Sequence, residues 1–359
     1  YCIVDIMTGL YYHEEKSDND QCRMYYSLDI TNSVHSFIYN NNNKQNKIGF
    51  KLQSLSHEAF EKVIQYDAYD NPHEECGINT TANANRVCTL SFTVDQDLEP
   101  PIMIYYEIEH FHQNHRSYQK SRDVYQLFGA ETQFKLDGDL CAPLNVLGNT
   151  RLNPCGLTAN TFFNDQISLM NTGIDMREDG IAWGSDMQYM FAHPDSFKSA
   201  PCPEGTCDSS CCAGDEWSCD EPAEKDGICY SYYYANEDTT QYLYETYPQI
   251  SPLDGVNDEH FIVWMRIAVL PTFRKLYGWI EEPIANGTTL SFQVINNWEV
   301  GSFQGRKSLV MTTTNMFGGR NDWMGWYYYI VGFFLLGVAL FTAIKQTFRP
   351  RKLGDRRYL

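Results

Sequence analysis

The sequence lacks the short motifs by which several large enzyme classes are identified. It has no glycine-rich loop followed by Lys-Ser or Lys-Thr for binding phosphates, no nucleophile elbow and no HExxH zinc motif. Serines, histidines and acidic residues are scattered without the spacing that a catalytic site requires. We therefore expect no enzymatic activity, no cofactor and no catalytic residue in this chain.

Basic residues are scarce as well. Lysine and arginine number 27 against 46 aspartates and glutamates, which gives the 359-residue chain a formal charge of −19. Nucleic-acid binding depends on basic patches that contact phosphates. The charge balance therefore argues against a nucleic-acid partner.

Only one apolar run is long enough to cross a membrane. Residues 323–344, WMGWYYYIVGFFLLGVALFTAI, contain 22 residues without a charge, and a helix of that length spans a hydrocarbon core of about 30 Å. Aromatic residues stand at its start, where their amphipathic rings favour the headgroup region. We predict a transmembrane helix over 323–344.

The residues after this helix form a basic tail. Residues 345–359 carry a net charge of +5, so removing them from the total of −19 leaves −24 on residues 1–344. Positive segments beside a span favour the cytosolic side. We therefore expect a cytosolic tail and an exoplasmic main part, facing the lumen or the cell exterior. The membrane would be that of the endoplasmic reticulum, Golgi, endosome or cell surface.

Cysteine usage fits an exoplasmic location. The chain has 12 cysteines, an even number, without zinc-finger spacing, and such a set suits disulfides formed in an oxidising compartment. Two sequons, Asn79 in NTT and Asn286 in NGT, indicate N-glycosylation. Both features favour a secreted or lumenal glycoprotein domain.

Residues 202–229 form an acidic, cysteine-rich insert. It has few apolar residues, so it cannot build a core and needs crosslinks. Paired CxxC spacing and an EF-hand ligand pattern are absent, which favours a disulfide knot over a zinc or calcium site. Six cysteines allow 15 connectivities, so the pairing stays open among Cys202, Cys207, Cys211, Cys212, Cys219 and Cys229.

Two stretches alternate with the period of a half-buried strand. They are VCTLSFTVD from Val87 and TTLSFQVINNWEV at 288–300, and GRKSLVMTTT at 305–314 indicates a further strand. We predict a mainly β fold with an antiparallel, sandwich-like domain and helical and loop insertions. The expected parts are a polar N-terminal extension (1–62), the exoplasmic domain (63–322), the transmembrane helix (323–344) and the tail (345–359).

Three histidines, His110, His112 and His115, lie within six residues in EHFHQNHRSYQKSRD. Histidine is a common metal ligand, so they raise the question of a metal site. The spacing differs from that of the helical zinc motif. The alternative is a set of hydrogen-bonding residues in a packed strand or loop.

Five blocks occur in order before the membrane helix: IYYEIEHFHQNHRSYQKSRDVYQLFG, LNPCGLTANTFFND, GIAWGSD, EHFIVWMRIAVLPTFRKLYGWI and FQGRKSLVMTTTNMFGGRND. Together they resemble the cell division control protein 50 family, the β-subunits of type IV P-type ATPases that flip phospholipids. The resemblance covers residues 63–345. Of the three histidines, only His115 stands at a family-typical position, which argues against a metal site.

The resemblance implies particular pairings and contacts. Cys141 with Cys155 matches one family disulfide, and Cys76 with Cys88 resembles another, whereas Cys2, Cys22 and the cysteine-rich insert lie outside the family core. The basic residues Arg116, Lys120 and Arg122 beside Asp123 are expected to form an internal polar network. The block WMRIAVLPTFRKLYGWI is either a buried wedge ended by Pro271 or a partner contact. Candidate contact residues are Arg274, Lys275 and Trp326.

By resemblance, the chain is a non-catalytic subunit that supports the folding, exit from the endoplasmic reticulum and transport cycle of a phospholipid-flipping ATPase, as its chaperone and partner. Residues 1–62 contain no apolar run of transmembrane length, whereas the family has two spans. Either the chain begins after a first helix, or a signal peptide has been removed. The second case would favour another role, a single-pass surface glycoprotein that associates with itself or with other exterior glycoproteins in adhesion or assembly.

Overall fold

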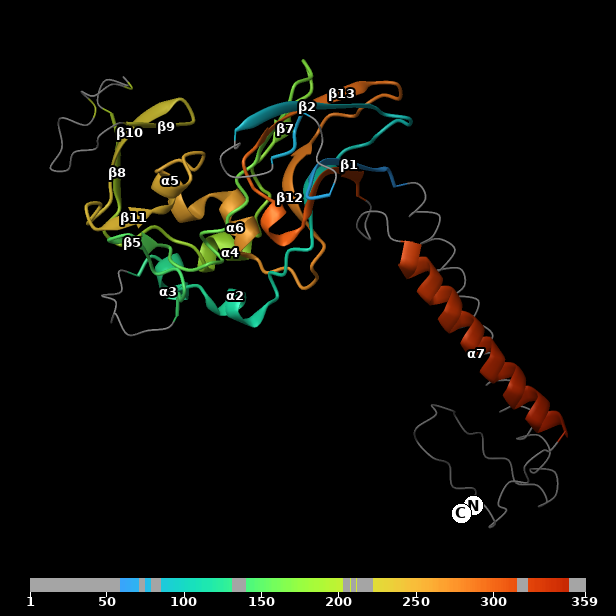
Figure 1. The fold of residues 1–359 in the computed structure, drawn as a ribbon. Coiled ribbons are helices and arrows are strands. Elements are labelled where there is room, and N and C mark those ends of the chain that lie inside the picture. The colour runs from blue at the N-terminus through green and yellow to red at the C-terminus, as the bar shows by residue number, and fades with distance from the viewer. Residues whose placement is uncertain are drawn as a thin grey trace, which may run out of the picture. The chain divides into compact units, whose positions relative to one another are not determined.

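The structure, a computed structural model, describes residues 59–70, 75–78, 85–130, 140–202, 207, 211, 222–314 and 322–348. One compact unit comprises Ala59–Gly319. The helix α7 (Asp322–Phe348) belongs to a second unit. The described residues confirm a mainly β fold with antiparallel sheets (Figure 1).

The first large sheet has five antiparallel strands in the order β1-β14-β3-β12-β7. The alternation in β3 explains its place, because Ile102, Ile104, Tyr106 and Ile108 are buried and the residues between them are half-buried. Six of the eight residues in β14 are buried, as expected of an inner strand. The strands span Glu61–Ala68 (β1), Arg306–Thr313 (β14), Ile102–Glu109 (β3), Phe273–Ile280 (β12) and Met176–Arg177 (β7).

The second large sheet has the order β2-β13-β6, with bounds Arg86–Thr93, Thr289–Asn296 and Gln166–Leu169. The predicted strands at 87–95 and 288–300 correspond to β2 and β13. Their inward residues form cross-strand pairs, Leu290 with Phe92 and Phe292 with Leu90. These side chains belong to the same hydrophobic core as the inner face of β3. The two sheets therefore enclose one core, as a sandwich does.

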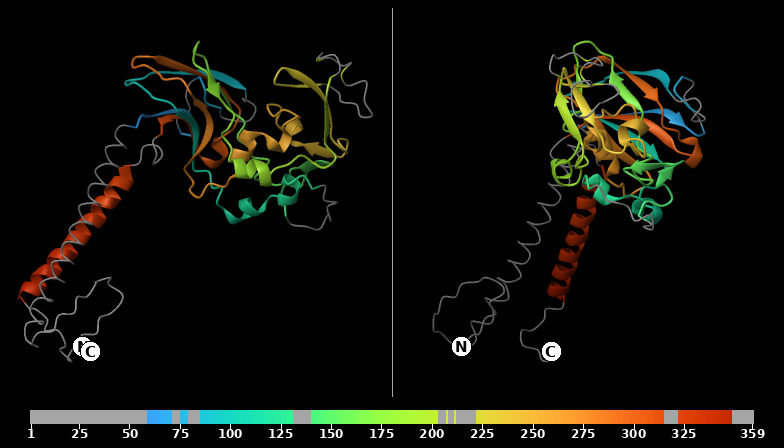
Figure 2. Two further views of the ribbon diagram at one scale, coloured as in Figure 1. Left: turned by 180° about the vertical axis from the view of Figure 1, so that it is seen from behind. Right: turned by 90° about the vertical axis from the view of Figure 1, so that its left-hand side faces the viewer.

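Helix α6 (Glu259–Met265) packs against β12, and Phe303 of the turn η5 (Gly301–Phe303) packs against the main core. Most of the other elements form a wing beside the two sheets (Figure 2). It contains a sheet in the order β8-β10-β9 and another in the order β11-β5-β4. The strands are Lys198–Pro201 (β8), Ile228–Tyr233 (β10), Ala223–Lys225 (β9), Thr240–Tyr242 (β11), Thr150–Asn153 (β5) and Val146–Leu147 (β4). The other helices are Arg116–Lys120 (α2), Val124–Leu127 (α3), Gly184–Tyr189 (α4), Leu243–Thr246 (α5) and the short 3-10 turn Gly255–Asn257 (η4).

The domain begins and ends at one pair of strands. β1 pairs antiparallel with β14, so that Glu61 lies opposite Thr312. Two hydrogen bonds close the end of this pair: Phe60 N–H donates to Thr313 Oγ1 (2.9 Å) and Thr313 N–H donates to Phe60 O (3.1 Å). Residues 1–58 lie outside the described residues, and with them most of the predicted N-terminal extension, including Cys2 and Cys22.

Four disulfides lie within the described residues. Cys76 bonds to Cys88 and Cys141 to Cys155, the two pairs that the family resemblance implies. In the cysteine-rich insert, Cys202 bonds to Cys211 and Cys207 to Cys229. The other two cysteines of the insert, Cys212 and Cys219, lie outside the described residues.

The NPCG motif shows why a glycine follows Cys155. Gly156 has a φ of +101°, and a Cβ built on it would come 2.1 Å from the carbonyl oxygen of Ser121. Any other residue would therefore clash with the backbone and strain its own. The Ser121 hydroxyl donates to Cys141 O (3.1 Å) and accepts from Leu157 N–H (2.9 Å), which joins this turn to the segment after α2.

The apolar run forms the 27-residue helix α7. Within it, Gly325–Phe348 is long and apolar enough to cross a membrane, with a mean hydropathy of 2.0. The helix extends four residues beyond the predicted end at Ile344, so Lys345 lies in its last turn. Residues 349–359 of the basic tail lie outside the described residues.

The Cys141–Cys155 disulfide closes a short loop, and its loss is expected to destabilise the domain. Replacing both residues by serine should lower the free energy of unfolding by about 3 kcal/mol, because the unfolded chain regains loop freedom. Thermal unfolding of the purified protein should show a midpoint lower by several degrees. Replacing one exposed serine, Ser117→Ala, is the control, and an equal midpoint for the double variant and the wild type would contradict the expectation.

Candidate functional site

A lysine ammonium is buried where the two large sheets meet. Lys307, on β14, has a fully buried side chain. Its Nζ donates to Asp165 Oδ2 (2.7 Å), to Asn296 Oδ1 and to Trp298 O, and lies 3.7 Å from Asp67 Oδ2. Asp67 belongs to β1 and Asn296 to β13. This one charge therefore connects both sheets.

The carboxylates around Lys307 have further partners. Tyr66 donates its hydroxyl to Asp165 Oδ2 (2.8 Å), while the backbone N–H groups of Asn297 (2.7 Å) and Trp298 (2.6 Å) donate to Oδ1. Two carboxyl groups therefore face one ammonium. Burial raises the pKa of Asp67, and the neighbouring Lys307 opposes this shift.

A second lysine is buried at the end of α6. The Nζ of Lys275 donates to three backbone carbonyls, those of Val263 (2.8 Å), Trp264 (2.7 Å) and Arg266 (2.5 Å). These groups are among the carbonyls that a helix leaves without partners at its C-terminus. Burial, and then the charge of Arg266, lowers the pKa of Lys275 to about 7. Lys275 therefore binds the C-terminal end of α6 inside the domain, and its buried position does not suit the direct partner contact predicted for it.

Its neighbour Arg274 points outward. The guanidinium donates to Glu107 Oε2 (2.6 Å) and Glu61 Oε2 (3.0 Å), which lie on β3 and β1. Its side chain is about one-third exposed. Arg274 thus stays a candidate contact residue, although its charge is already matched. Trp326, in α7, is 54% exposed.

The predicted wedge has a buried part and an exposed tip. Phe261, Ile262, Trp264 and Met265 of α6 are buried, whereas Val269 and Leu270 are 77% and 65% exposed. The tip is attached to the segment before α2, because Asn114 Nδ2 donates to Val269 O (2.7 Å) and Phe111 N–H to Pro271 O (3.1 Å).

The internal polar network predicted for the basic residues near α2 is wrong. Arg116 and Lys120 are exposed, and Arg122 is half-buried. Within the part of the chain that the structure describes, none of the three forms an ion pair. Asp123 instead begins α3, where its carboxylate accepts from Tyr125 N–H (2.8 Å).

The hydrogen bond from Asn114 to Val269 O attaches the exposed tip, with Val269 and Leu270, to the segment that leads into α2, which carries the exposed Arg116 and Lys120. We call Arg116, Lys120, Val269 and Leu270 the docking face. Exposed cations beside exposed apolar side chains are typical of a surface that contacts another protein.

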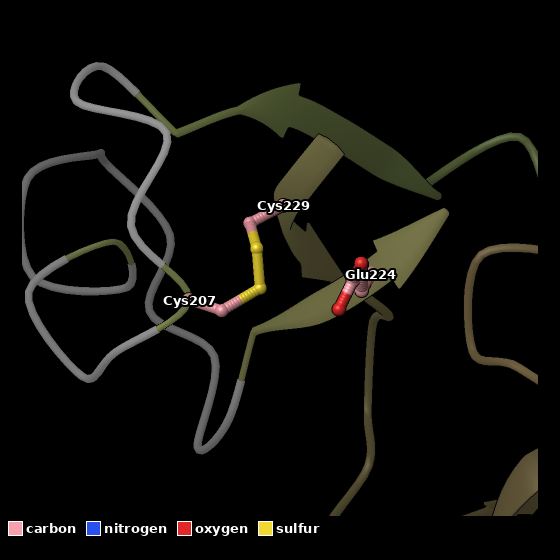
Figure 3. Close-up of side chains that lie close together, drawn as sticks. All are labelled: Cys207, Glu224 and Cys229. Atoms are coloured by element: carbon pink, nitrogen blue, oxygen red, sulfur yellow. A yellow bond between two sulfur atoms is a disulfide. The ribbon is translucent and has the colours of Figure 1, made fainter. Parts of the chain in front are cut away.

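The three histidines do not form a metal site within the described residues. His110 Nδ1 lies 2.9 Å from Gln304 O, while His112 and His115 are exposed. Among the described residues, the side chains of Cys207, Glu224 and Cys229 bring potential metal-ligand atoms close together (Figure 3). Its two cysteines are bonded to each other, so no thiolate is available for a metal.

One of the two sequons lies within the described residues. Asn286 is exposed in the turn before β13, and its backbone N–H donates to Asp97 Oδ1 (2.8 Å). A glycan on this side chain would project into solvent. Asn79 lies outside the described residues.

Sequence reasoning missed the inward position of both lysines. In GRKSLVMTTT the apolar residues are only Leu309, Val310 and Met311, so the sequence did not mark Lys307 as buried. Asp67 and Asp165 gave no signal either, because their importance comes from contacts between distant segments.

Comparison with known proteins identifies relatives over most of the chain. The model of the LEM3 (ligand-effect modulator 3) family / CDC50 family matches residues 13–352. ALA-interacting subunit 3 of Arabidopsis thaliana is 34% identical over 282 residues, which cover 77% of this chain and 68% of that protein. Cell cycle control protein 50A of Bos taurus is 32% identical over 310 residues, or 82% and 78% of the two chains.

A yeast relative has a more explicit name. The phospholipid-transporting ATPase accessory subunit CRF1 of Saccharomyces cerevisiae is 30% identical over 288 residues. The match covers 77% of this chain and 63% of the yeast protein.

Lys307→Met is expected to destabilise the domain strongly. Without the ammonium, Asp165 and Asp67 remain buried as uncompensated acids, a change that typically costs about 3–5 kcal/mol. The loss in free energy of unfolding should be smaller at mildly acidic pH than at neutral pH. Without Lys307 the raised pKa of Asp67 rises further, and a protonated acid needs no counter-charge. Urea unfolding at both pH values measures this, with Lys62→Met, an exposed position on β1, as the control. A loss that is independent of pH would contradict the explanation.

Lys275→Met is expected to change how stability depends on pH. Between about pH 7 and the ordinary lysine value, the unfolded chain keeps a proton that folded Lys275 has partly released. The free energy of unfolding of the wild type should therefore rise with pH in this range, relative to the variant. The difference between the two unfolding curves, measured against pH, tests the sign. A difference that falls with rising pH would show that the three carbonyls keep Lys275 charged.

Proposed function

Because this chain belongs to the CDC50 family, we propose that it is the non-catalytic β-subunit of a phospholipid-flipping P-type ATPase. The family match over residues 13–352 carries this conclusion. A relative that is 30% identical is named an accessory subunit of a phospholipid-transporting ATPase. ATP hydrolysis and the lipid path would lie in the partner, which moves phospholipid to the cytosolic leaflet.

We place the β-rich domain on the exoplasmic side and the basic tail in the cytosol. The disulfides support this placement, because they persist in oxidising compartments. The exposed sequon Asn286 and the charge of the tail agree with it. In this arrangement α7 crosses the membrane, and Trp326 lies near its exoplasmic end, where it can contact a helix of the ATPase.

A subunit without chemistry of its own acts through binding free energy. It stabilises the folded ATPase by mass action, which explains a role in folding and in exit from the endoplasmic reticulum. It can favour one transport state only by binding that state more tightly than the others. The transport cycle therefore has to change the surface that this domain contacts.

The docking face supplies the chemistry for such a contact. Arg116 and Lys120 are exposed cations on a strongly acidic chain, and Val269 and Leu270 are exposed apolar groups on the tip that Asn114 holds to the segment before α2. We propose that the face binds an acidic and partly apolar exterior surface of the ATPase. Arg274 contributes less, because Glu61 and Glu107 already match its charge.

The function is tested by purifying the full-length protein from its native membrane in mild detergent. Mass spectrometry should identify a P-type ATPase in one-to-one amount. Recovery of the protein alone, or with other copies and exterior glycoproteins, would overturn the proposal and favour the alternative role in adhesion or assembly.

Reversing the charge of the docking face should weaken the complex. In the variant Arg116→Glu/Lys120→Glu, like charges would face the acidic surface, and the amount of copurified ATPase should fall about tenfold. The control Lys62→Glu/Arg151→Glu makes the same change of charge at exposed positions on β1 and β5. Equal recovery of the ATPase with both variants would argue against the docking face. Thermal unfolding should be unchanged in either variant.

A further inference from the structure

A cavity of about 220 Å³ lies within the β-rich domain, apart from the docking face. Its lining includes four aromatic residues, Tyr106, Phe162, Phe163 and Tyr277. All four are buried. The volume is well below the several hundred Å³ of drug-binding pockets, so only a compact ligand fits.

Within the described residues, the carboxyl groups in the lining have no basic lysine or arginine side chain among them. Asp258, Glu178 and Asp165 line the cavity, and no lysine or arginine of the described residues does so. Asp165 is matched by Lys307. Glu178, whose side chain is 44% exposed, has its Oε2 2.9 Å from His260 Nε2. Asp258 accepts from Phe261 N–H (2.8 Å) at the start of α6. The cavity therefore favours positive charge.

The acidic groups do not suit a metal ion. In the described residues, the ligand atoms of Glu178, Asp258 and His260 do not form a close group of the kind that holds a metal. Aromatic walls with separated carboxylates instead match an organic cation, which is attracted by ring faces as well as by charge.

One further group points to an oxygen on the ligand. The side-chain amide of Gln249 lines the cavity, and its Nε2 is buried without an acceptor among the described residues. A buried donor without a partner costs free energy, which a ligand hydroxyl can recover by accepting the hydrogen bond. Gln249 comes from the segment after α5, and Glu178 from the segment after β7.

We propose that this cavity binds a small organic cation that carries a hydroxyl group, of the amino-alcohol class. The aromatic residues surround the ammonium group, Glu178 and Asp258 match its charge, and Gln249 donates to its hydroxyl. The ligand is the free amino alcohol and not a phospholipid headgroup, because a phosphate would be repelled by the same carboxylates. This site is independent of the proposed binding to an ATPase.

Calorimetric titration of the full-length protein in detergent tests the site with choline as the probe. Saturable binding is expected, with at least about tenfold weaker binding of dimethylbutanol, the uncharged isostere of choline. Phosphocholine should also bind at least about tenfold more weakly than choline. No saturable binding of choline, or equal binding of the isostere, would overturn the proposal. Equal binding of phosphocholine would overturn the assignment to a free amino alcohol.

Two variants separate the contributions of charge and hydrogen bonding. Glu178→Gln should weaken choline binding about tenfold, whereas Asp175→Asn, which removes one nearby exposed charge outside the cavity, should leave it unchanged. Gln249→Leu should abolish the preference for choline over tetramethylammonium, which lacks the hydroxyl. Equal effects of Glu178→Gln and Asp175→Asn would overturn the assigned role of Glu178. Cooperative thermal unfolding of each variant checks that it is folded.

Discussion

The buried ammonium of Lys307 is the interaction on which the arrangement of the two sheets depends. A charge removed from water is tolerated only when its hydrogen bonds and counter-charges are in place. The partners of Lys307 come from β1, from β13, from Trp298, two residues after β13, and from the segment before β6. Hydrophobic contacts alone would allow the sheets to slide past each other. The directional bonds of one ammonium favour a single register.

Lys275 and Lys307 also affect the surface of the domain, because both use their positive charge inside it. The chain is acidic to begin with, and these two residues leave still fewer cations exposed. The exposed pair Arg116 and Lys120 therefore stands out against an acidic background. An electrostatic contact with another subunit can thus be specific without a large basic patch.

Much of the fold could be predicted from local patterns. Alternation located β2 and β13, and the uncharged run located α7, because both signals are carried by neighbouring residues. The pairs Cys76–Cys88 and Cys141–Cys155 followed only from the family resemblance. The cavity and the inward lysines were not predictable, because they join segments far apart in the sequence. The exposure of Arg116 and Lys120 was missed because Asp123, the acid expected to pair with them, instead caps the start of α3.

The adjacent start and end of the domain have a mechanical consequence. Phe60 and Thr313 are hydrogen-bonded to each other at the open end of the β1–β14 pair. Tension that separates the two flanking segments would load these bonds one after another, as in unzipping, and would leave the rest of the domain unstressed.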